Sequence, residues 1–316
     1  MAIVLMVQAT KPEQLAQIRA QYPDWQFKTP TELKPDEYDQ VKVVYGNHPL
    51  VSTLLDRPTN QLQFLQVISA GVDYLPLTAL KRAHVQVANT SGIHADAIGE
   101  SVLAAMLTVV RGYHAAWLNQ TGERAWQLPV KTTTLRERQL LIFGTGQIGQ
   151  SIAQKAAAFG MRIVGVNTTG HPATHFDDTV ALDAVATNLA TADFIVNAMP
   201  LTPATRHYFN ARRFAQLTKH PMLINIGRGP AVDQHDLVAA LDAQQLSIAA
   251  LDVTEVEPLP ATDPLWQRDD VLITPHVSGQ IDHFRTTVFA IFAANFAQFV
   301  KDGSLARNRV DLERGY

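Results

Sequence analysis

The chain of 316 residues contains no cysteine. Disulfides, a cysteine nucleophile and cysteine-ligated metal sites are therefore excluded, and no other pattern leads us to expect a bound metal. Long apolar runs are also missing. The longest, residues 102–110, contains Thr108 and is far shorter than the roughly 20 residues that cross a bilayer. We therefore expect no membrane-spanning helix and no membrane partner.

An excess of one charge is missing as well. The 26 basic and 29 acidic residues give a net charge of −3, and like charges form no block. Because nucleic-acid-binding surfaces are strongly basic, we expect no nucleic-acid partner. The N-terminus lacks the basic region of a secretory signal and enters a strand-like run at residues 3–7 directly. This favours a cytoplasmic location.

Among the residues that are present, Arg228, Glu257 and His276 attract attention because each follows a short apolar run typical of a buried strand. The three runs are residues 222–226, 247–253 and 271–273. In an open parallel sheet, ligands bind beyond the carboxyl ends of the strands. We therefore expect these three side chains to share one cleft.

A glycine-rich segment lies upstream, with the sequence Gly144-Thr145-Gly146-Gln147-Ile148-Gly149. It follows the apolar run 140–143 and opens a helical pattern over 147–159, which is the context that a dinucleotide fingerprint requires. The first glycine would permit a tight turn, the second a close approach of the backbone to a pyrophosphate, and the third close packing of helix on strand. A glycine loop that binds nothing is the alternative, and this context makes it the weaker one.

The order of predicted elements indicates two α/β domains. Strand-like runs at residues 3–7, 41–45, 64–68 and 85–88, with a helix at 12–21, form a first domain over 1–95. A continuous helix over 95–117 connects it to a second alternating series, so the dinucleotide-binding domain covers 96–282. An apolar helix at 284–300 follows, and the segment 283–316 is expected to return to the first domain. The ligand cleft would then lie between the two domains.

Taken together, these motifs resemble those of the D-isomer-specific 2-hydroxyacid dehydrogenase family over essentially the whole chain. The set in this order is far more specific than any single motif. The matching stretches are SAGVD at 69–73, AIGE at 97–100, GTGQIG at 144–149, MPLTPAT at 199–205, NIGRG at 225–229, LDVTEVEP at 251–258 and TPH at 274–276.

The resemblance implies an α/β fold with two doubly wound parallel sheets, one in a Rossmann-type dinucleotide-binding domain and one in a smaller flavodoxin-like substrate domain. It also implies an oxidoreductase that transfers a hydride between NAD(P)H and a 2-keto acid to give a D-2-hydroxy acid. Family members are commonly homodimers, and the segment 122–129, with Trp126, is suited to reach a partner subunit.

The chemistry of a keto-acid reductase assigns a role to each of three residues. Arg228 can hold the carboxylate and polarise the ketone through its planar fork of donors. His276 is the expected proton donor, and Glu257 would favour its protonated form. Ten other histidines are present, so only the family pattern singles out His276. Glu255 competes with Glu257, which is chosen because the family's catalytic glutamate immediately precedes a proline.

Further site residues are predicted from the motifs and strand ends together with the same resemblance. The loop residues Ala70, Gly71 and Val72 would bind the substrate carboxylate, with Tyr45 and Tyr74 shaping the pocket or serving as core residues. Cofactor contacts are expected from Gly144, Gly146, Gln147, Ile148, Gly149, Asn167, Thr168, Thr169, Met199, Pro200, Thr205, Ile226, Asp252 and Gly279.

The residue at position 167 bears on the choice of dinucleotide. NAD-selective enzymes place an acidic residue about 20 positions after the glycines, where it accepts from the ribose hydroxyls. Here Asn167 stands at the end of the strand, followed by Thr168 and Thr169 and, two positions further, His171. Since no carboxylate would repel a 2′-phosphate, NADP is favoured over NAD, with use of both as an alternative.

Other functions remain open at this stage. A glyoxylate or hydroxypyruvate reductase is an alternative within the family, and Tyr45 and Tyr74 lean towards a substrate with an apolar side chain. A non-catalytic dinucleotide-sensing protein, similar to corepressors of the same fold, is an alternative from another class. Formate dehydrogenases carry glutamine at the position of Glu257, and the regulated phosphoglycerate branch usually has a further C-terminal domain, so both are disfavoured.

Overall fold

The computed structural model describes residues 1–122, 124, 126 and 132–315. The chain divides into two compact units. The central unit comprises His94–Gln280, and the N-terminal unit comprises Met1–Ile93 together with the C-terminal segment that begins at Ile281. Each is a doubly wound α/β unit with a parallel sheet, so the predicted fold class is confirmed. Among the described residues, no helix has the length and apolar character needed to cross a membrane.

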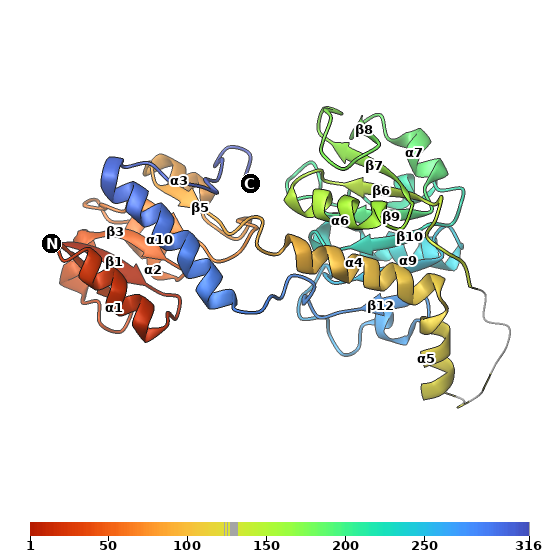
Figure 1. The fold of residues 1–316 in the computed structure, drawn as a ribbon, viewed down its shortest axis with the longest axis horizontal. Coiled ribbons are helices and arrows are strands. Elements are labelled where there is room, and N and C mark those ends of the chain that lie inside the picture. The colour runs from red at the N-terminus through yellow and green to blue at the C-terminus, as the bar shows by residue number, and fades with distance from the viewer. Residues whose placement is uncertain (123, 125, 127–131, 316) are drawn as a thin grey trace. The chain divides into compact units, whose positions relative to one another are not determined.

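The central unit is built on a seven-stranded parallel sheet with the order β12-β11-β10-β9-β6-β7-β8 (Figure 1). Its strands are short, and the inner ones are almost entirely buried, as expected for a sheet covered on both faces, whereas the edge strands are partly exposed. They are β6 (Gln139–Phe143), β7 (Arg162–Asn167), β8 (Asp178–Ala181), β9 (Phe194–Asn197), β10 (Met222–Asn225), β11 (Ile248–Leu251) and β12 (Val271–Ile273).

Helices cover both faces of this sheet because successive strand residues point to opposite sides. Leu140 and Ile142 of β6 pack towards α4 (Ala95–Val110) and α6 (Gln147–Ala157). Leu141 and Phe143 pack towards the opposite layer. That layer contains α7 (Ala186–Thr191), α8 (Ala211–Phe214) and α9 (Gln234–Asp242), and two 3₁₀ turns, η2 (Gly229–Ala231) and η3 (Pro264–Gln267), complete the unit.

The strand order reverses direction between β6 and β9. From β6 the chain proceeds outward through β7 and β8, and it then returns to β9 and proceeds the other way through β10, β11 and β12. Such a topological switch point is where open α/β sheets bind ligands. The loop after β6 carries the three glycines, and the loop after β9 carries Met199 and Pro200.

The N-terminal unit has a five-stranded parallel sheet with the order β2-β1-β3-β4-β5. The phenylalanine-rich helix α10 and helix α1 cover one face, and two shorter helices cover the other. The elements are β1 (Ala2–Met6), α1 (Pro12–Gln21), β2 (Trp25–Lys28), η1 (Pro35–Gln40), β3 (Val41–Tyr45), α2 (Leu50–Leu55), β4 (Phe64–Gln66), α3 (Leu77–Arg82), β5 (Gln86–Ala88) and α10 (Phe284–Asp302).

Helix α10 packs on the same face of this sheet as α1. Phe292 stacks on Tyr45 at a centroid distance of 4.5 Å, and Phe296 makes edge contacts with Trp25 and Phe27. These rings form part of the apolar core on this face of the sheet. The C-terminal segment is thus an integral layer of the unit that begins the chain.

Two expectations about elements need correction. The predicted continuous helix over 95–117 is interrupted, because Gly112 adopts a left-handed conformation (φ 74°) that ends α4 and begins α5 (Tyr113–Thr121). Only glycine adopts this conformation without a steric cost. Strand β2 was not predicted, since its alternation of polar Gln26 and Lys28 with aromatic residues is a weak signal in four residues.

Candidate functional site

The three glycines of the loop after β6 differ in the space around them. Gly144 has φ 103°, and a Cβ there would lie 2.8 Å from the carbonyl oxygen of Ala198. A Cβ on Gly149 would lie 1.9 Å from the carbonyl oxygen of Gly144, which no side chain tolerates. A Cβ on Gly146, in contrast, would meet nothing within 4 Å. The first and third glycines are therefore required by packing, while the second borders open space.

Helix α6 begins directly after Gly146 and points its first amides at this open space. The N-terminus of a helix offers unsatisfied N–H groups and the positive end of the helix dipole, which together favour a phosphate. Gln147 is exposed and Ile148 half-buried beside the core under α6. The loop therefore offers a place for an anionic group at the switch point of the sheet.

Asn167 organises the segment that follows β7. Its amide group donates to the carbonyl oxygen of His171 (2.8 Å) and to Oγ1 of Thr145 (3.2 Å). Its Oδ1 accepts from the backbone N–H groups of Thr169 and His171, both at 3.2 Å. Thr168, Thr169 and His171 are exposed around this turn. The turn thus presents hydrogen-bonding groups, and no carboxylate, beside the glycine loop.

The loop after β9 is held by its own side chains. Thr205 is buried, and its Oγ1 donates to the carbonyl oxygen of Pro200 (2.7 Å) while accepting from the N–H of Thr202 (2.8 Å). Met199 is buried in the core, whereas Pro200 is exposed. Within this predicted set, Thr205 and Met199 shape the loop, and Pro200 lies at its surface.

Arg228 follows β10 on a segment with almost no free space around its backbone. A Cβ at Gly227 would lie 2.8 Å from the carbonyl oxygen of Met199, and one at Gly229 would lie 1.7 Å from that of Thr254. The half-buried Arg228 side chain donates from Nη1 to the carbonyl oxygen of Gly227 (2.8 Å). Because the two flanking glycines have no side chain, this segment can pack directly against the loops after β9 and β11.

Glu257 and His276 are joined directly. Nδ1 of His276 lies 2.8 Å from Oε2 of Glu257, and Oε1 of Glu257 accepts from the N–H of Thr254 (3.1 Å). Both carboxylate oxygens are thus engaged, which fixes the carboxylate and turns the imidazole so that Nε2 is the ring nitrogen away from it. The His276 side chain is 54% exposed. A histidine oriented by a carboxylate, with its other nitrogen accessible, is a suitable general acid or base.

Asp252 anchors the loop that carries His276. Its Oδ1 accepts from Oγ1 of Thr274 (2.6 Å) and from the N–H of Val277 (3.0 Å), and Oδ2 accepts from the hydroxyl of Ser278. Its backbone carbonyl accepts from the N–H of His276 (2.9 Å). The carboxylate of Asp252 is therefore directed at residues 274–278. This is a structural task in addition to the cofactor-side role expected for it.

Two other predicted cofactor residues lie at the borders of this region. Ile226 is buried, and its backbone N–H donates to the carbonyl oxygen of Asn197 (3.1 Å). Gly279 faces the start of α4, where its carbonyl oxygen accepts from Nδ1 of His94 (2.6 Å). His94 is thereby accounted for as the residue that ties residue 279 to the first turn of α4.

The predicted substrate loop of the N-terminal unit is a stretch without helix between β4 and α3. Oγ of Ser69 donates to the carbonyl oxygen of Gly71 (2.8 Å). The side-chain amide of Asn89 donates to the carbonyl oxygen of Ala70 (2.8 Å). Val72 is buried in the core. Helix α3 begins only at Leu77, and the side chains of Ser69 and Asn89 fix the orientation of the loop peptides.

The two tyrosines assigned to the pocket differ. Tyr45 is fully buried against Phe292, and its hydroxyl has no hydrogen-bond partner among the described residues. Burial raises the pKa of its phenol. Tyr45 is therefore a core residue, the alternative left open by the sequence, and its assignment to the pocket is corrected. Tyr74 is 48% exposed, and its hydroxyl lies 2.7 Å from Oγ of Ser69, so it does border the loop.

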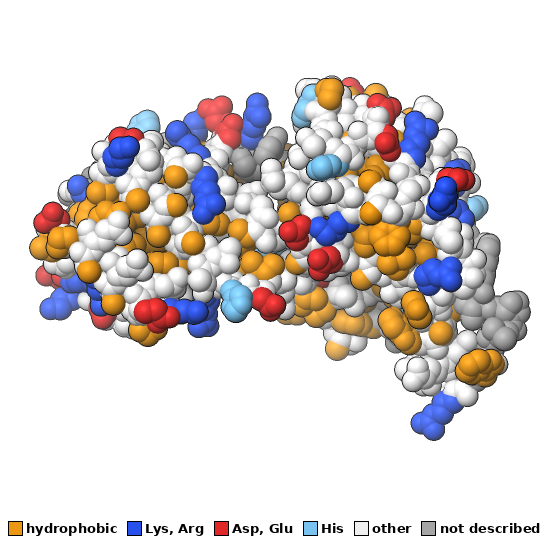
Figure 2. Space-filling view, in the orientation of Figure 1, with side chains coloured by type: hydrophobic (Ala, Val, Ile, Leu, Met, Phe, Trp, Pro, Cys, Tyr) orange, Lys and Arg blue, Asp and Glu red, His pale blue; other side chains and the backbone are white. Residues whose placement is uncertain are grey.

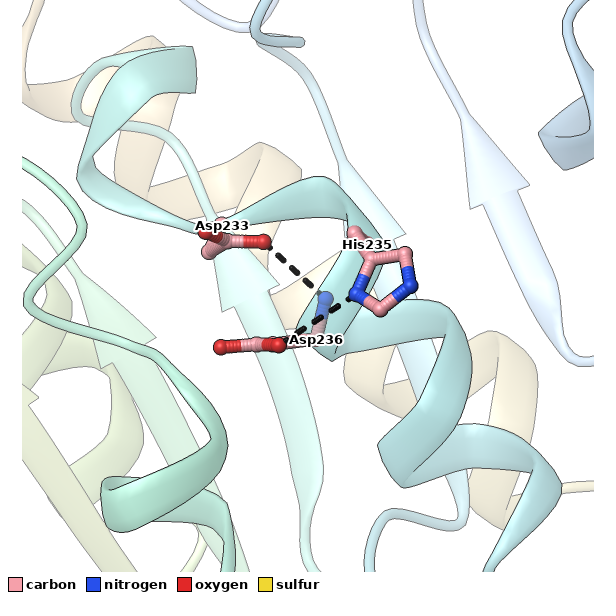
Figure 3. Close-up of side chains that lie close together, drawn as sticks. All are labelled: Asp233, His235 and Asp236. Atoms are coloured by element: carbon pink, nitrogen blue, oxygen red, sulfur yellow. Dashed lines mark hydrogen bonds and ion pairs between the residues drawn. The ribbon is translucent and has the colours of Figure 1, made fainter.

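Asp233, His235 and Asp236 form a group whose ligand-type atoms lie within 4.8 Å of one another (Figure 3). The positions of the Asp233 and Asp236 carboxylates are explained by helix capping. Oδ1 of Asp233 accepts from the N–H of Asp236 (3.0 Å), and Oδ2 of Asp236 accepts from the N–H of Ala211 (2.8 Å). These bonds satisfy donors at the starts of α9 and α8. The group therefore has a structural explanation and supports no metal assignment.

Sequence reasoning missed several residues that build the site. Asn197 and Asn225 end β9 and β10 and are buried, and the amide of Asn197 donates to Oδ1 of Asn225 (2.9 Å). Oδ1 of Asn197 also accepts from the N–H of Met199 (3.2 Å), and Oδ1 of Asn225 accepts from the N–H of Gly227 (3.3 Å). A polar residue at the end of an otherwise apolar strand was the available signal. His207, in the loop between β9 and α8, was also missed.

The chain is similar to proteins of one known family. A family sequence profile described as "D-isomer specific 2-hydroxyacid dehydrogenase, NAD binding domain" matches residues 103–278. The mouse (Mus musculus) glyoxylate reductase/hydroxypyruvate reductase is 31% identical over 264 residues, which are 80% of this chain and 80% of the mouse protein.

Two solved structures are similar over nearly the whole chain. A protein described as phosphoglycerate dehydrogenase from Lactobacillus plantarum is 70% identical with a TM-score of 0.60, covering 98% of this chain and 100% of its own. A D-isomer specific 2-hydroxyacid dehydrogenase from Xanthobacter autotrophicus Py2, in complex with NADPH and MES, is 27% identical with a TM-score of 0.83. The match covers 100% of this chain and 99% of the other.

Proposed function

We propose that this chain, which belongs to the D-isomer-specific 2-hydroxyacid dehydrogenase family and is therefore an NAD(P)-dependent oxidoreductase, uses Arg228, Glu257 and His276 to reduce a small 2-keto acid to a D-2-hydroxy acid. The observation that carries the proposal is the Glu257–His276 hydrogen bond of 2.8 Å beyond the carboxyl ends of two adjacent strands. Such a pair combines a proton donor with the group that orients it.

The residues at the switch point fit a dinucleotide. Gly146 borders open space at the start of α6, while Gly144 and Gly149 have no room for a side chain. The helix N-terminus would hold the pyrophosphate, and the turn organised by Asn167 would face the adenosine ribose. When bound, the reduced nicotinamide supplies the hydride.

In the reduction, the ketone carbon accepts the hydride and the ketone oxygen accepts a proton. His276 is placed to give that proton from Nε2, because Nδ1 is held by Glu257. The proton leaves as the carbon–oxygen double bond becomes a single bond, so the product is the neutral hydroxyl and His276 becomes the neutral imidazole. In the oxidative direction, the same nitrogen takes the proton back.

Arg228 provides the positive charge of the proposed site. Its guanidinium can bind the substrate carboxylate through two parallel N–H donors, which orients the keto group and draws electron density from the ketone oxygen. A lysine in its place would keep the charge but lose the fork. The loop formed by Ala70, Gly71 and Val72 would supply further contacts to the substrate.

We propose NADP as the preferred cofactor. Asn167 stands where NAD-selective enzymes carry an acid, and Thr168, Thr169 and His171 are exposed around it. None of these groups is an acid that would repel a 2′-phosphate, and they include hydrogen-bond donors for it. The similar protein from Xanthobacter was solved with NADPH bound, which supports the proposal.

Two substrate classes compete within this reaction. The name of the mouse relative points to glyoxylate and hydroxypyruvate, and that of the Lactobacillus relative to a phosphorylated hydroxy acid. The segments that follow β3, β4 and β5 in the N-terminal unit, residues 46–49, 67–76 and 89–93, contain no lysine or arginine. A second anionic group would find no permanent cation there, so we favour an unphosphorylated substrate. The buried Tyr45 also removes one argument for a bulky apolar substrate.

The test is the initial rate of cofactor oxidation with NADPH and NADH. Glyoxylate, hydroxypyruvate, 3-phosphohydroxypyruvate, pyruvate and phenylpyruvate form the substrate panel. Turnover of hydroxypyruvate at least ten-fold above its 3-phosphate would support the preferred class, and the reverse order would favour the phosphorylated one. Tight binding of NADPH without turnover of any keto acid would instead favour the dinucleotide-sensing alternative.

We also propose a homodimer formed through the central unit. A mostly apolar cavity of about 310 Å³ lies beside α4 and α5 over β10, β11 and β12, and Trp117 at its edge is 54% exposed. Figure 2 shows hydrophobic side chains along α4 and beside α5. Exposed apolar surface of this kind marks interaction sites. The mass of wild type and Trp117→Lys by light scattering tests the proposal, with a monomeric wild type contradicting it.

Two related expectations remain predictions. Of the segment 122–129, residues 123, 125 and 127–129 lie outside the described residues, and Trp126 is 94% exposed. A second subunit that covers Trp126 would lower this exposure. The cytoplasmic location also remains a prediction from the sequence.

A further inference from the structure

Three segments of the central unit carry or adjoin Arg228 and Glu257 of the proposed site, and the side chain of a residue in the first segment lies against the other two. The segments are residues 199–210 after β9, 226–234 after β10 and 252–258 after β11. His207 belongs to the first, is 37% exposed, and has a left-handed backbone (φ 48°). A residue other than glycine holds this conformation only where its surroundings determine it.

The ring of His207 faces a carboxylate from each of the other two segments. Its Nε2 lies 2.7 Å from Oε1 of Glu255, which stands two positions before Glu257. Its Nδ1 lies 3.5 Å from Oδ2 of Asp233, which stands five positions after Arg228. One imidazole therefore lies between the loop of the proposed catalytic glutamate and the loop of the proposed catalytic arginine.

Backbone contacts connect the same segments. The N–H of His207 donates to the carbonyl oxygen of Pro230 (2.8 Å), and that of Phe209 donates to the carbonyl oxygen of Ala231 (3.0 Å). The loops that contain Gly229 and Thr254 touch so closely that a Cβ on Gly229 would lie 1.7 Å from the Thr254 oxygen. The His207–Glu255 contact joins the first segment to the third, so each of the three segments contacts the other two.

The two glutamates of residues 252–258 thus have separate partners. Glu257 is bonded to His276, and Glu255 to His207, at 2.8 and 2.7 Å. Because they belong to one short loop, any movement of Glu255 moves the backbone that carries Glu257. A proton donor that is displaced by a fraction of an ångström loses much of its effectiveness.

We propose that His207 and Glu255 are positioning residues for the reduction, with His207 holding the Glu257 loop and the Arg228 loop in register. This inference rests on the proposed function of Arg228, Glu257 and His276. It assigns no contact with substrate or cofactor to either residue. Its effect is transmitted through the backbone of residues 252–258 and 228–234.

The experiment compares His207→Ala, His207→Gln, Glu255→Ala and the double variant His207→Ala/Glu255→Ala with the full-length wild type. Glutamine keeps a donor near the position of Nε2. His235→Ala is the matched control, because His235 is a histidine near the start of α9 whose side chain is 93% exposed. Keto-acid kinetics, the NADPH dissociation constant and amide hydrogen exchange of residues 228–234 and 252–258 are measured for each.

We expect His207→Ala to lower kcat by on the order of ten-fold with the NADPH dissociation constant unchanged. His207→Gln should recover most of this loss, since a structural cavity alone would not be repaired by restoring one donor. The double variant should be no slower than the worse single variant, as for two residues that act through one contact. Amide exchange should accelerate in both segments in His207→Ala and remain as in wild type in His235→Ala.

Hydrogen exchange separates failure of this inference from failure of the proposed function, because it needs no turnover. If the wild type reduces a keto acid but His207→Ala has wild-type kcat, the positioning role is refuted. It is equally refuted if exchange accelerates in only one segment or if losses in the two single variants multiply in the double variant. If the wild type itself is inactive, the proposed function fails, and faster exchange in both segments would still support the coupling.

Discussion

Glu257 and His276 are 19 positions apart in the chain, yet Oε2 of the first lies 2.8 Å from Nδ1 of the second. Their strands, β11 and β12, are adjacent and parallel, so the loops that follow them emerge side by side. Asp252 then binds residues 274–278 through its carboxylate, which brings the histidine to the glutamate. The adjacency of β11 and β12 and the buried carboxylate of Asp252 together bring Glu257 and His276 into contact.

Replacement of His276 by alanine should lower kcat by on the order of 10²- to 10⁴-fold, because the nascent alkoxide loses its proton donor. Binding of NADPH should be nearly unchanged, since His276 lies after β12 and the glycine loop after β6. Steady-state kinetics and NADPH fluorescence titration measure the two effects. His283→Ala, at the N-terminus of α10 in the other unit, is the control. Wild-type turnover in His276→Ala would remove this residue from the acid role.

Replacement of Arg228 by alanine should raise the KM for the keto acid and also slow turnover, because orientation and polarisation are lost together. Arg228→Lys should restore only part of the activity, since the ammonium group cannot form two parallel hydrogen bonds. Both variants are compared in kcat, KM and NADPH affinity. A change confined to NADPH affinity would show that Arg228 serves the cofactor and not the substrate.

Asn167→Asp should shift cofactor selectivity from NADPH towards NADH by at least about ten-fold in the ratio of kcat/KM values. A carboxylate at this position would repel the 2′-phosphate and accept from a free 2′-hydroxyl. Gln17→Glu, an equal charge change at an exposed position of α1, is the control. An unaltered ratio in Asn167→Asp would mean that the turn after β7 does not face the ribose.

At low pH, protonation of Asp39 should remove its ion pair with Arg57 in the N-terminal unit. Arg57 binds Asp39 through Nε (2.6 Å) and Nη2 (2.9 Å), and these hydrogen bonds lower the pKa of Asp39 from 3.8 to about 2. A lowered folded-state pKa stabilises the protein above the unfolded-state value, and this stabilisation is lost as the pH falls towards the folded-state value.

Asp39→Asn should therefore unfold at a lower urea concentration than wild type at pH 6, and the difference should shrink between about pH 4 and about pH 2. The effect should be small, because the pair is partly exposed and screened by solvent. Urea midpoints at pH 6 and pH 2.5 measure it. Equal midpoints at pH 6, or a difference that grows as the pH is lowered, would contradict the assigned stabilisation.

Much of the fold was accessible from local sequence patterns. Short apolar runs separated by helical stretches predicted two parallel sheets, because strands buried on both faces need continuous apolar residues. Glycines at 144, 146 and 149 predicted a loop between β6 and α6, which the structure contains. The break between α4 and α5 escaped prediction, since a single Gly112 within an apolar helical pattern is compatible with an uninterrupted helix.

The sequence by itself determined which residue types follow which strands, and thereby that Arg228, Glu257 and His276 emerge from one edge of a sheet. The tertiary structure alone decided which glutamate pairs with which histidine, and that Tyr45 is buried against Phe292 in the core. The physical reason is the range of the interactions. Strand and helix patterns repeat over two to four residues, whereas hydrogen bonds and ring contacts join residues from distant segments that only the packed sheet brings together.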